Sequence, residues 1–133
     1  MSRKSVKVVR AFIDAYNEGD MDSAFSNLAS GFEYDGSRAQ GPDSRGIYNR
    51  DQFREFLADF AEPWESPVRV EPHEFIEAGD KVVVPWTFRA AGRDGINLHA
   101  RVVMAFTLGD GTIERICMFQ LKAEALEAIG LSE

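Results

Sequence analysis

The apolar residues of this sequence change their spacing near Pro63, and that change narrows the folds open to the chain. Before Pro63, three segments place apolar side chains at i, i+3, i+4 and i+7, as one face of a helix does: residues 9–16, 21–28 and 53–60. After it, two segments alternate apolar and polar side chains, as half-buried strands do: residues 82–90 and 98–108. Helices followed by strands predict an α+β fold, with three N-terminal helices packed on a mainly antiparallel sheet.

Residues that start or stop helices stand at the ends of these helical segments. Gly19 would end the first helix and Asp20 would cap the second, since glycine tolerates a left-handed backbone and aspartate accepts bonds from free N–H groups. Asn49 and Gln52 have the spacing of a capping box for the third helix, which Pro63 would end. We therefore expect three separate helices.

Further strands complete the predicted order of elements. Residues 32–35, 68–78 and 113–121 also indicate strands, and residues 123–129 a closing helical turn that Gly130 stops. Short glycine-containing turns join the last four strands, so we expect them to form an antiparallel meander within one domain, residues 1–133. Residues 36–49 form a long polar loop, and such a loop often has a function, for example as a lid.

Charge and cysteine content exclude several classes of protein. The 133 residues carry a formal net charge of −7, with basic residues scattered among more numerous acids, so we expect neither nucleic acid nor a membrane as partner. The single cysteine, Cys117, excludes an intrachain disulfide and is typical of a reducing compartment. No apolar run reaches the length of a signal or membrane segment, which predicts a cytoplasmic protein.

Three motifs resemble the SnoaL-like branch of the nuclear transport factor 2-like superfamily. They are VRAFIDAYNEGDMD at residues 9–22, EAGDKVVV at 77–84 and GDGTIE at 109–114. The resemblance covers nearly the whole chain and implies a cone, in which a curved, mixed, mainly antiparallel sheet wraps the helices and leaves a pocket at its open end. Members include polyketide cyclases, ketosteroid isomerases, dehydratases, epoxide hydrolases, transport factors and proteins that catalyse nothing known, so the fold does not give the function.

The catalytic residues of these relatives are only partly present. The resemblance to ketosteroid isomerases places their carboxylate base at Asp35, assuming a one-residue shift in the preceding loop, but their two oxyanion donors at Phe12 and near Met104. Neither of these side chains donates a hydrogen bond, and losing one such donor costs on the order of 10²–10³ in rate. The SnoaL-type cyclases use a carboxylate on the last strand, where this chain offers only Gln120.

A small set of polar residues remains as candidates for chemistry. Asp35 would act as a base next to a carbonyl if it faces the pocket, while Asp35-Gly36 also suits a simple turn. Tyr34, Tyr16 and Gln120 would orient a substrate. The two histidines, His73 and His99, together with Cys117 lack the number and spacing of zinc ligands, so we expect no metal and no cofactor.

The inward-facing residues of helices and strands predict an apolar pocket, with a filled core as the alternative. These residues are Phe12, Phe53, Phe56, Trp64, Val84, Trp86, Phe88, Met104, Phe106 and Met118.

The opposite face of the sheet also carries apolar residues, which favours a two-fold dimer over scattered surface positions. The predicted dimer face comprises Val83, Pro85, His99, Arg101, Val103, Cys117 and Phe119.

Two hypotheses lead from the sequence, and a transport adaptor role also stays open. The first is an isomerase- or cyclase-type enzyme that acts on a small hydrophobic carbonyl compound, polycyclic or terpenoid-like, with Asp35 as base. The second is a non-catalytic domain of the same fold that binds an apolar ligand or pairs with a second copy. The absent oxyanion donors favour the second hypothesis.

Overall fold

The computed structural model describes residues 2–37 and 46–131. The helices are α1 (Ser2–Asn17), α2 (Met21–Phe25), α3 (Arg50–Ala61) and α4 (Lys122–Ala128), with a short 3₁₀ turn, η1, at Arg93–Gly95. The strands are β1 (Leu28–Asp35), β2 (Ile47–Asn49), β3 (Arg69–Pro72), β4 (Ile76–Ala78), β5 (Lys81–Ala91), β6 (Asn97–Gly109) and β7 (Thr112–Phe119). None of the helices in this part of the chain is long and apolar enough to cross a membrane.

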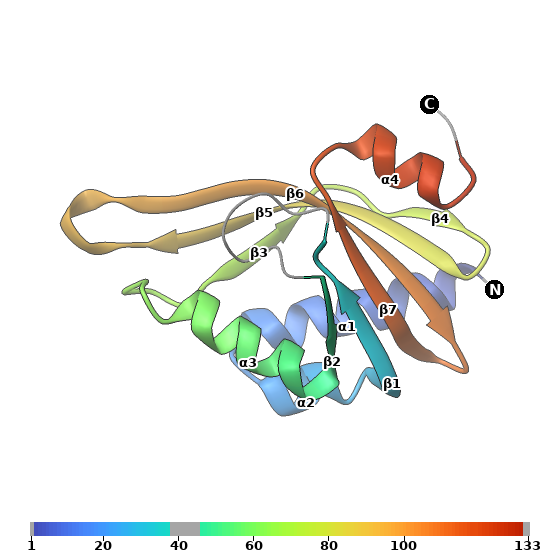
Figure 1. Ribbon diagram of the computed structural model, residues 1–133, viewed down its shortest axis with the longest axis horizontal. Coiled ribbons are helices and arrows are strands. Elements are labelled where there is room, and N and C mark those ends of the chain that lie inside the picture. Colours follow the sequence, from blue (N-terminus) through green and yellow to red (C-terminus); the bar gives the residue numbers. More distant parts are fainter. Residues whose placement is uncertain (1, 38–45, 132–133) are drawn as a thin grey trace.

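One curved, mixed sheet organises the molecule. Its strand order is β2-β1-β7-β6-β5-β3, with β4 paired to β5, and the pairs are antiparallel except for the parallel pair β1–β7. Helices α1, α2 and α3 lie on one side of the sheet and α4 lies on the other (Figure 1). The predicted α+β fold with a mainly antiparallel curved sheet is confirmed, and α4 is an additional helix in place of a closing turn.

Most helices begin or end close to the residues that the sequence predicted. Asn49 and Gln52 form the capping box of α3, with bonds of 2.8 and 2.9 Å between each side chain and the other residue's backbone N–H. Gly19 adopts a φ of +79° beyond the end of α1, and Asp20 accepts a bond from the backbone of Ser23. Helix α2 is shorter than expected, because Leu28 already pairs with Ile113 as the start of β1.

The strands also depart from the predicted order in two places. Residues 68–78 were expected as one strand but form β3 and β4, because the pairing with β5 changes register between Pro72, opposite Trp86, and Ile76, opposite Val83. Strand β2 lies within the segment 36–49 that was expected to be a loop. Residues 38–45 of that segment, and with them the suggested lid, lie outside the described residues.

Asn17, at the C-terminal end of α1, joins this helix to the edge of the sheet. Its side-chain amide donates to the carbonyl of Val70 at 2.8 Å and accepts from the N–H of Val70 at 2.7 Å. Val70 belongs to β3, which among the described residues has a strand neighbour on one side only. Asn17 thus supplies the pair of hydrogen bonds that a further strand would make.

The outer face of the sheet has its own apolar cluster, and α4 covers it. Val83, Val103, Ala105 and Phe119 are buried there against Ala125 and Leu126, with Cys117 partly buried beside them. The sequence correctly placed Val83, Val103, Cys117 and Phe119 on one face, but the structure fills that face with the chain's own helix. While α4 is in place, the buried members of this cluster are not accessible to a second copy.

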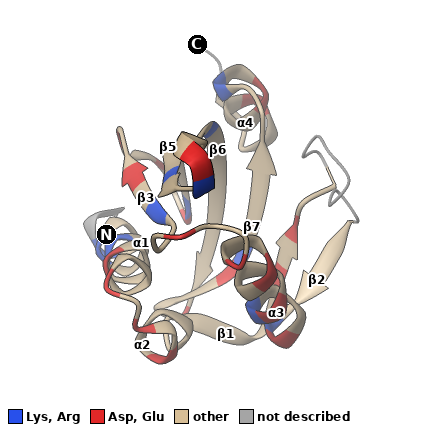
Figure 2. Ribbon diagram, turned by 90° about the vertical axis from the view of Figure 1, so that its left-hand side faces the viewer, with Lys and Arg blue, Asp and Glu red and all other residues tan. Residues whose placement is uncertain are grey.

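Charged side chains are distributed over both helices and strands. Figure 2 shows acidic and basic residues interleaved on α3, α4 and the β3 region. Several pairs link separate elements, including Arg54 with Asp22 at 2.8 Å and Lys122 with Glu74 at 2.8 Å. Exposed pairs of this kind contribute about 0.2–1 kcal/mol each, so the second pair adds only modestly to the attachment of α4.

Candidate functional site

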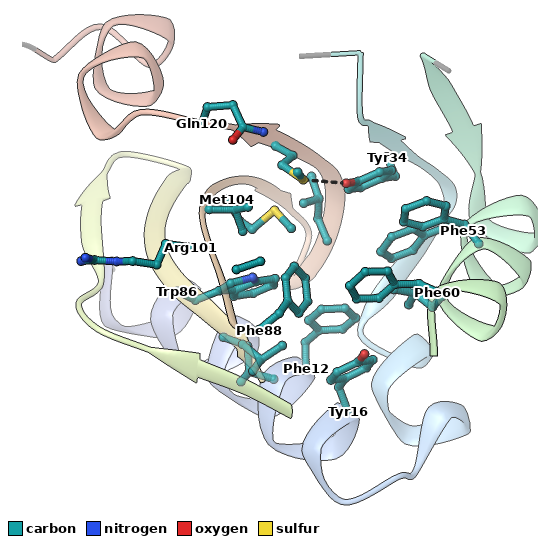
Figure 3. A pocket seen from close by; sticks show the side chains of 18 residues that line it. Phe12, Tyr16, Tyr34, Phe53, Phe60, Trp86, Phe88, Arg101, Met104 and Gln120 are labelled. Atoms are coloured by element: carbon teal, nitrogen blue, oxygen red, sulfur yellow. Dashed lines mark hydrogen bonds between the residues drawn. The ribbon is translucent and has the colours of Figure 1, made fainter. Parts of the chain in front are cut away.

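A cavity of about 360 Å³ lies between the sheet and helices α1 and α3. This volume is at the lower end of the range for small-molecule sites. Its wall consists of Phe12, Ile13, Tyr16, Tyr34, Phe53, Phe56, Leu57, Phe60, Val70, Trp86, Phe88, Ala100, Arg101, Val102, Met104, Ile116, Met118 and Gln120. Figure 3 shows these side chains arranged around a common space, with Tyr34 from β1 beside Phe53 from α3, and Met104 and Trp86 from the strands β6 and β5 across from them.

Stacked aromatic rings make one wall of the cavity. The ring of Tyr34 lies 4.6 Å from that of Phe53 and 5.7 Å from that of Phe56, with interplanar angles of 20° and 27°. Phe56 continues the stack to Phe60, at 6.4 Å and 9°. The i, i+3, i+4, i+7 spacing on α3 is what brings these phenylalanines to one face. Nearly parallel rings create a flat apolar surface, which suits a flat ligand.

Hydrogen-bond donors are sparse in this wall. The hydroxyl of Tyr34 donates to the sulfur of Met118 at 3.2 Å, and a thioether is a weak acceptor. Burial raises the pKa of Tyr16 to about 12. Burial, followed by the neighbouring Cys117, Tyr48 and Asp35 groups, also raises the pKa of Tyr34. Both phenols therefore keep their protons at neutral pH and can donate them in hydrogen bonds.

Asp35 does not belong to the wall of the cavity. Its Oδ2 accepts a bond from Arg115 at 2.7 Å, and its Oδ1 accepts bonds from the backbone and hydroxyl of Ser37 at 3.0 and 2.6 Å. Tyr34 precedes it in β1 and faces the cavity, and successive side chains of a strand point to opposite faces. Asp35 therefore does not line the pocket as expected. Its carboxylate instead pairs with Arg115 and accepts the hydrogen bonds of the turn after β1.

The family model for the SnoaL-like domain matches residues 9–116 of this sequence. The chain belongs to the SnoaL-like family. A search of curated proteins finds no match to this SnoaL-like sequence.

Solved structures with the nuclear transport factor 2-like or ketosteroid isomerase-like fold are similar to this SnoaL-like domain. TerC, co-crystallised with polyporic acid, is 23% identical with a TM-score of 0.72, over 95% of this chain and 97% of TerC. A nuclear transport factor 2-like protein from Burkholderia pseudomallei is 21% identical with a TM-score of 0.72, over 96% and 98% of the two chains. A protein from Catenulispora acidiphila with a ketosteroid isomerase-like fold, in complex with trimethylamine, is 14% identical with a TM-score of 0.69, over 93% and 92%. At these identities the likeness establishes the fold alone.

Most residues that the sequence assigned to the pocket line the cavity of the SnoaL-like domain. They are Phe12, Phe53, Phe56, Trp86, Phe88, Met104 and Met118, together with Tyr16, Tyr34 and Gln120. Val84 and Phe106 share their inward direction but are completely buried in the core. Trp64 is partly buried and packs against the core without lining the cavity.

Sequence reasoning missed several lining residues for which a signal existed. Phe60 belongs to the apolar stripe of α3, and Ala100 and Val102 follow the alternation of β6. Ile13, Leu57 and Val70 also border the cavity. Alternation predicts which face of the sheet a side chain points to. It does not predict whether that level of the strand borders the cavity or lies in the filled core.

Of the two basic residues expected on the outer face, Arg101 borders the cavity and His99 does not. Figure 3 shows the side chain of Arg101 pointing away from the cavity, and the residue is exposed. His99 is exposed opposite Arg89, and Pro85 is partly buried. His73 contacts the hydroxyl of Thr87 at 2.7 Å. Among the described residues, no three histidine, cysteine or acidic side chains cluster in a way that would hold a metal ion.

Proposed function

We propose that the cavity binds a small, flat, hydrophobic carbonyl compound of polycyclic or terpenoid type. The observation that carries this proposal is the stacked aromatic wall of an apolar cavity of about 360 Å³. Apolar walls supply affinity, and a few polar groups fix the orientation of the ligand. Tyr16, Tyr34 and Gln120 line the cavity and offer hydrogen bonds to a carbonyl oxygen. TerC, which has a similar fold, was co-crystallised with polyporic acid, and we therefore choose that compound as a first probe.

Proton transfer at the bound carbonyl compound is the alternative activity. It would require the carboxylate of Asp35 to leave Arg115 and Ser37 and turn into the cavity. None of the side chains that line the cavity is a carboxylate or an imidazole within the described residues, so binding without turnover is the function we favour. We expect Asp35→Asn to bind ligand as the wild type does. Loss of a turnover activity in that variant, with binding retained, would establish the alternative.

Thermal unfolding with a panel of flat ketones, quinones and polyporic acid tests the binding proposal. A ligand at 100 times its Kd adds about 2.7 kcal/mol of stability, which raises the Tm of a domain of this size by several degrees. Ala100→Phe places a ring in the cavity and should abolish the shift, because Ala100 is part of its wall.

Ala91→Phe is the matched control, since Ala91 is an exposed residue on the neighbouring strand. It should leave the ligand-induced shift intact. The absence of a shift with every member of the panel, or equal shifts in the Ala100→Phe variant and the wild type, would contradict the proposal.

A further inference from the structure

The indole N–H of Trp86 is a buried donor without a partner. Trp86 is only 4% exposed, and its Nε1 has no hydrogen-bond partner among residues 2–37 and 46–131. More than nine-tenths of buried polar groups in proteins have a partner, so an exception calls for an explanation. Trp86 also lines the cavity, and Figure 3 shows its indole extending from β5 into the enclosed space.

The three nearest strand neighbours of Trp86 offer this donor no acceptor. Its neighbours on the inner face are Val84 and Phe88 on β5 and Val102, which pairs with it from β6. All three side chains are hydrocarbons, so a small movement of the indole finds no oxygen among them. Edge-to-face contacts with Phe88 at 5.5 Å and Phe106 at 6.1 Å also hold the ring in its present plane.

Trp86 differs in this respect from the other donors of the cavity. The hydroxyl of Tyr34 already donates to Met118. Tyr16 is less deeply buried than Trp86, and its hydroxyl does not stand among the buried polar atoms without a partner. An indole nitrogen donates one hydrogen bond and accepts none. A ligand that satisfies it must therefore present an acceptor atom next to the apolar wall of β5 and β6.

We propose that Trp86 Nε1 anchors the ligand by donating a hydrogen bond to its carbonyl oxygen, so that the pocket selects flat ketones and quinones over the corresponding hydrocarbons. This inference rests on the proposed function, because it assumes that the cavity takes up a ligand. It assigns to Trp86 a specificity role in addition to its apolar contact. One net hydrogen bond between neutral groups corresponds to roughly a 3- to 10-fold change in Kd.

A matched pair of probes isolates this hydrogen bond. Fluorene and 9-fluorenone share a flat three-ring skeleton, and only the ketone carries an acceptor. Equilibrium dialysis gives the Kd of each probe for the wild type, for Trp86→Phe and for Tyr16→Phe. We expect Trp86→Phe to reduce the preference for the ketone, measured as the ratio of the two Kd values, by roughly 3- to 10-fold. Tyr16→Phe removes a competing donor of the cavity. Trp64→Phe, measured in the same way, is the control and should leave the ratio unchanged, because Trp64 packs against the core without lining the cavity.

The outcomes separate the two proposals. If both probes bind and Trp86→Phe leaves the ratio unchanged, the Trp86 anchor is refuted while the ligand pocket stands. If the ratio falls in Tyr16→Phe and not in Trp86→Phe, the anchor is Tyr16 and the inference is overturned. If neither probe binds the wild type, at concentrations where polyporic acid or other ketones also fail, the proposed function falls and this inference falls with it.

Nuclear magnetic resonance of the unmodified side chain tests the same bond without depending on a Trp86 variant. The protein has two tryptophans, Trp64 and Trp86, so a proton–nitrogen spectrum contains two indole signals, and Trp64→Phe identifies them. We expect 9-fluorenone to move the Trp86 indole proton downfield and fluorene to leave it within the small range of ring-current effects. An unmoved Trp86 signal in the presence of bound 9-fluorenone would overturn the proposal.

Discussion

The link between Asn17 and Val70 gives a quantitative test of how α1 is held against the sheet. Asn17→Ala removes two hydrogen bonds, of 2.8 and 2.7 Å, and leaves both backbone groups of Val70 without this partner. Each net bond contributes about 1 kcal/mol, so we expect the free energy of unfolding to fall by about 2 kcal/mol. For a domain of this length the Tm should fall by about 8 °C.

Urea denaturation of four proteins resolves this effect: the wild type, Asn17→Ala, Asn17→Asp and Asn97→Ala. Asn17→Asp keeps an oxygen that accepts from the N–H of Val70 but loses the donor to its carbonyl, so its stability should lie between those of the wild type and Asn17→Ala. Asn97 is an exposed asparagine at the start of β6 and controls for the loss of an amide. Equal unfolding free energies for Asn17→Ala and Asn97→Ala would refute the idea that these two bonds secure α1.

Three further changes have defined expected outcomes. Asn49→Ala removes the capping box of α3 and should cost about 1 kcal/mol in urea denaturation, and unchanged stability would contradict a role for the cap. Leu126→Ala uncovers the outer apolar cluster, so we expect a loss of about 2–3 kcal/mol and stronger self-association in sedimentation, whereas Glu127→Ala, an exposed neighbour, should show neither. Burial raises the pKa of Tyr16 to about 12, whereas the hydroxyl of the unfolded chain loses its proton above pH about 10. The free energy of unfolding should therefore decrease as the pH rises from about 10 to about 12. Tyr16→Phe should therefore flatten this alkaline decline in the urea midpoint, and identical declines would argue against a buried hydroxyl.

Local patterns in the sequence were sufficient for much of the fold. The alternation of residues 82–90 and 98–108 predicted the long β5–β6 pair, because a half-buried strand needs that pattern. Met118 and Gln120 were also expected in the pocket, and both line the cavity. The capping residues of α3 were also readable, since a capping box depends on residues only three positions apart.

The orientation of Asp35 was not predictable in the same way. Its assignment relied on an assumed shift of one residue, and such a shift exchanges Tyr34 for Asp35 on the inner face. The parallel pairing of β1 with β7 fixes the observed register, with Tyr34 opposite Ile116 and Asp35 opposite Cys117. That pairing joins distant parts of the chain, so local spacing does not reveal it.

The element that covers the outer face of the sheet was also not predictable from local patterns, because its position depends on contacts between distant parts of the chain. Strand parity showed that Val83, Val103 and Phe119 share an apolar face, but a second copy and the chain's own α4 would satisfy that pattern equally. The structure shows α4 in this position. A dimer through the rest of this face, near His99 and Arg101, remains a proposal that the sedimentation experiment with Leu126→Ala also examines.

The parallel pair β1–β7 has a consequence for how the protein is made. Arg115 bonds to Asp35 across 80 residues of sequence, and Tyr34 and Ile116, both in the cavity wall, lie opposite each other in the same pair. Contacts of such long sequence separation form slowly, because closing the long intervening loop costs conformational entropy before the contact is gained. During synthesis, the ribosome must therefore release β7 before the cavity can close, and until then the nascent chain exposes the stacked rings beside β1 to chaperones and to other unfinished chains.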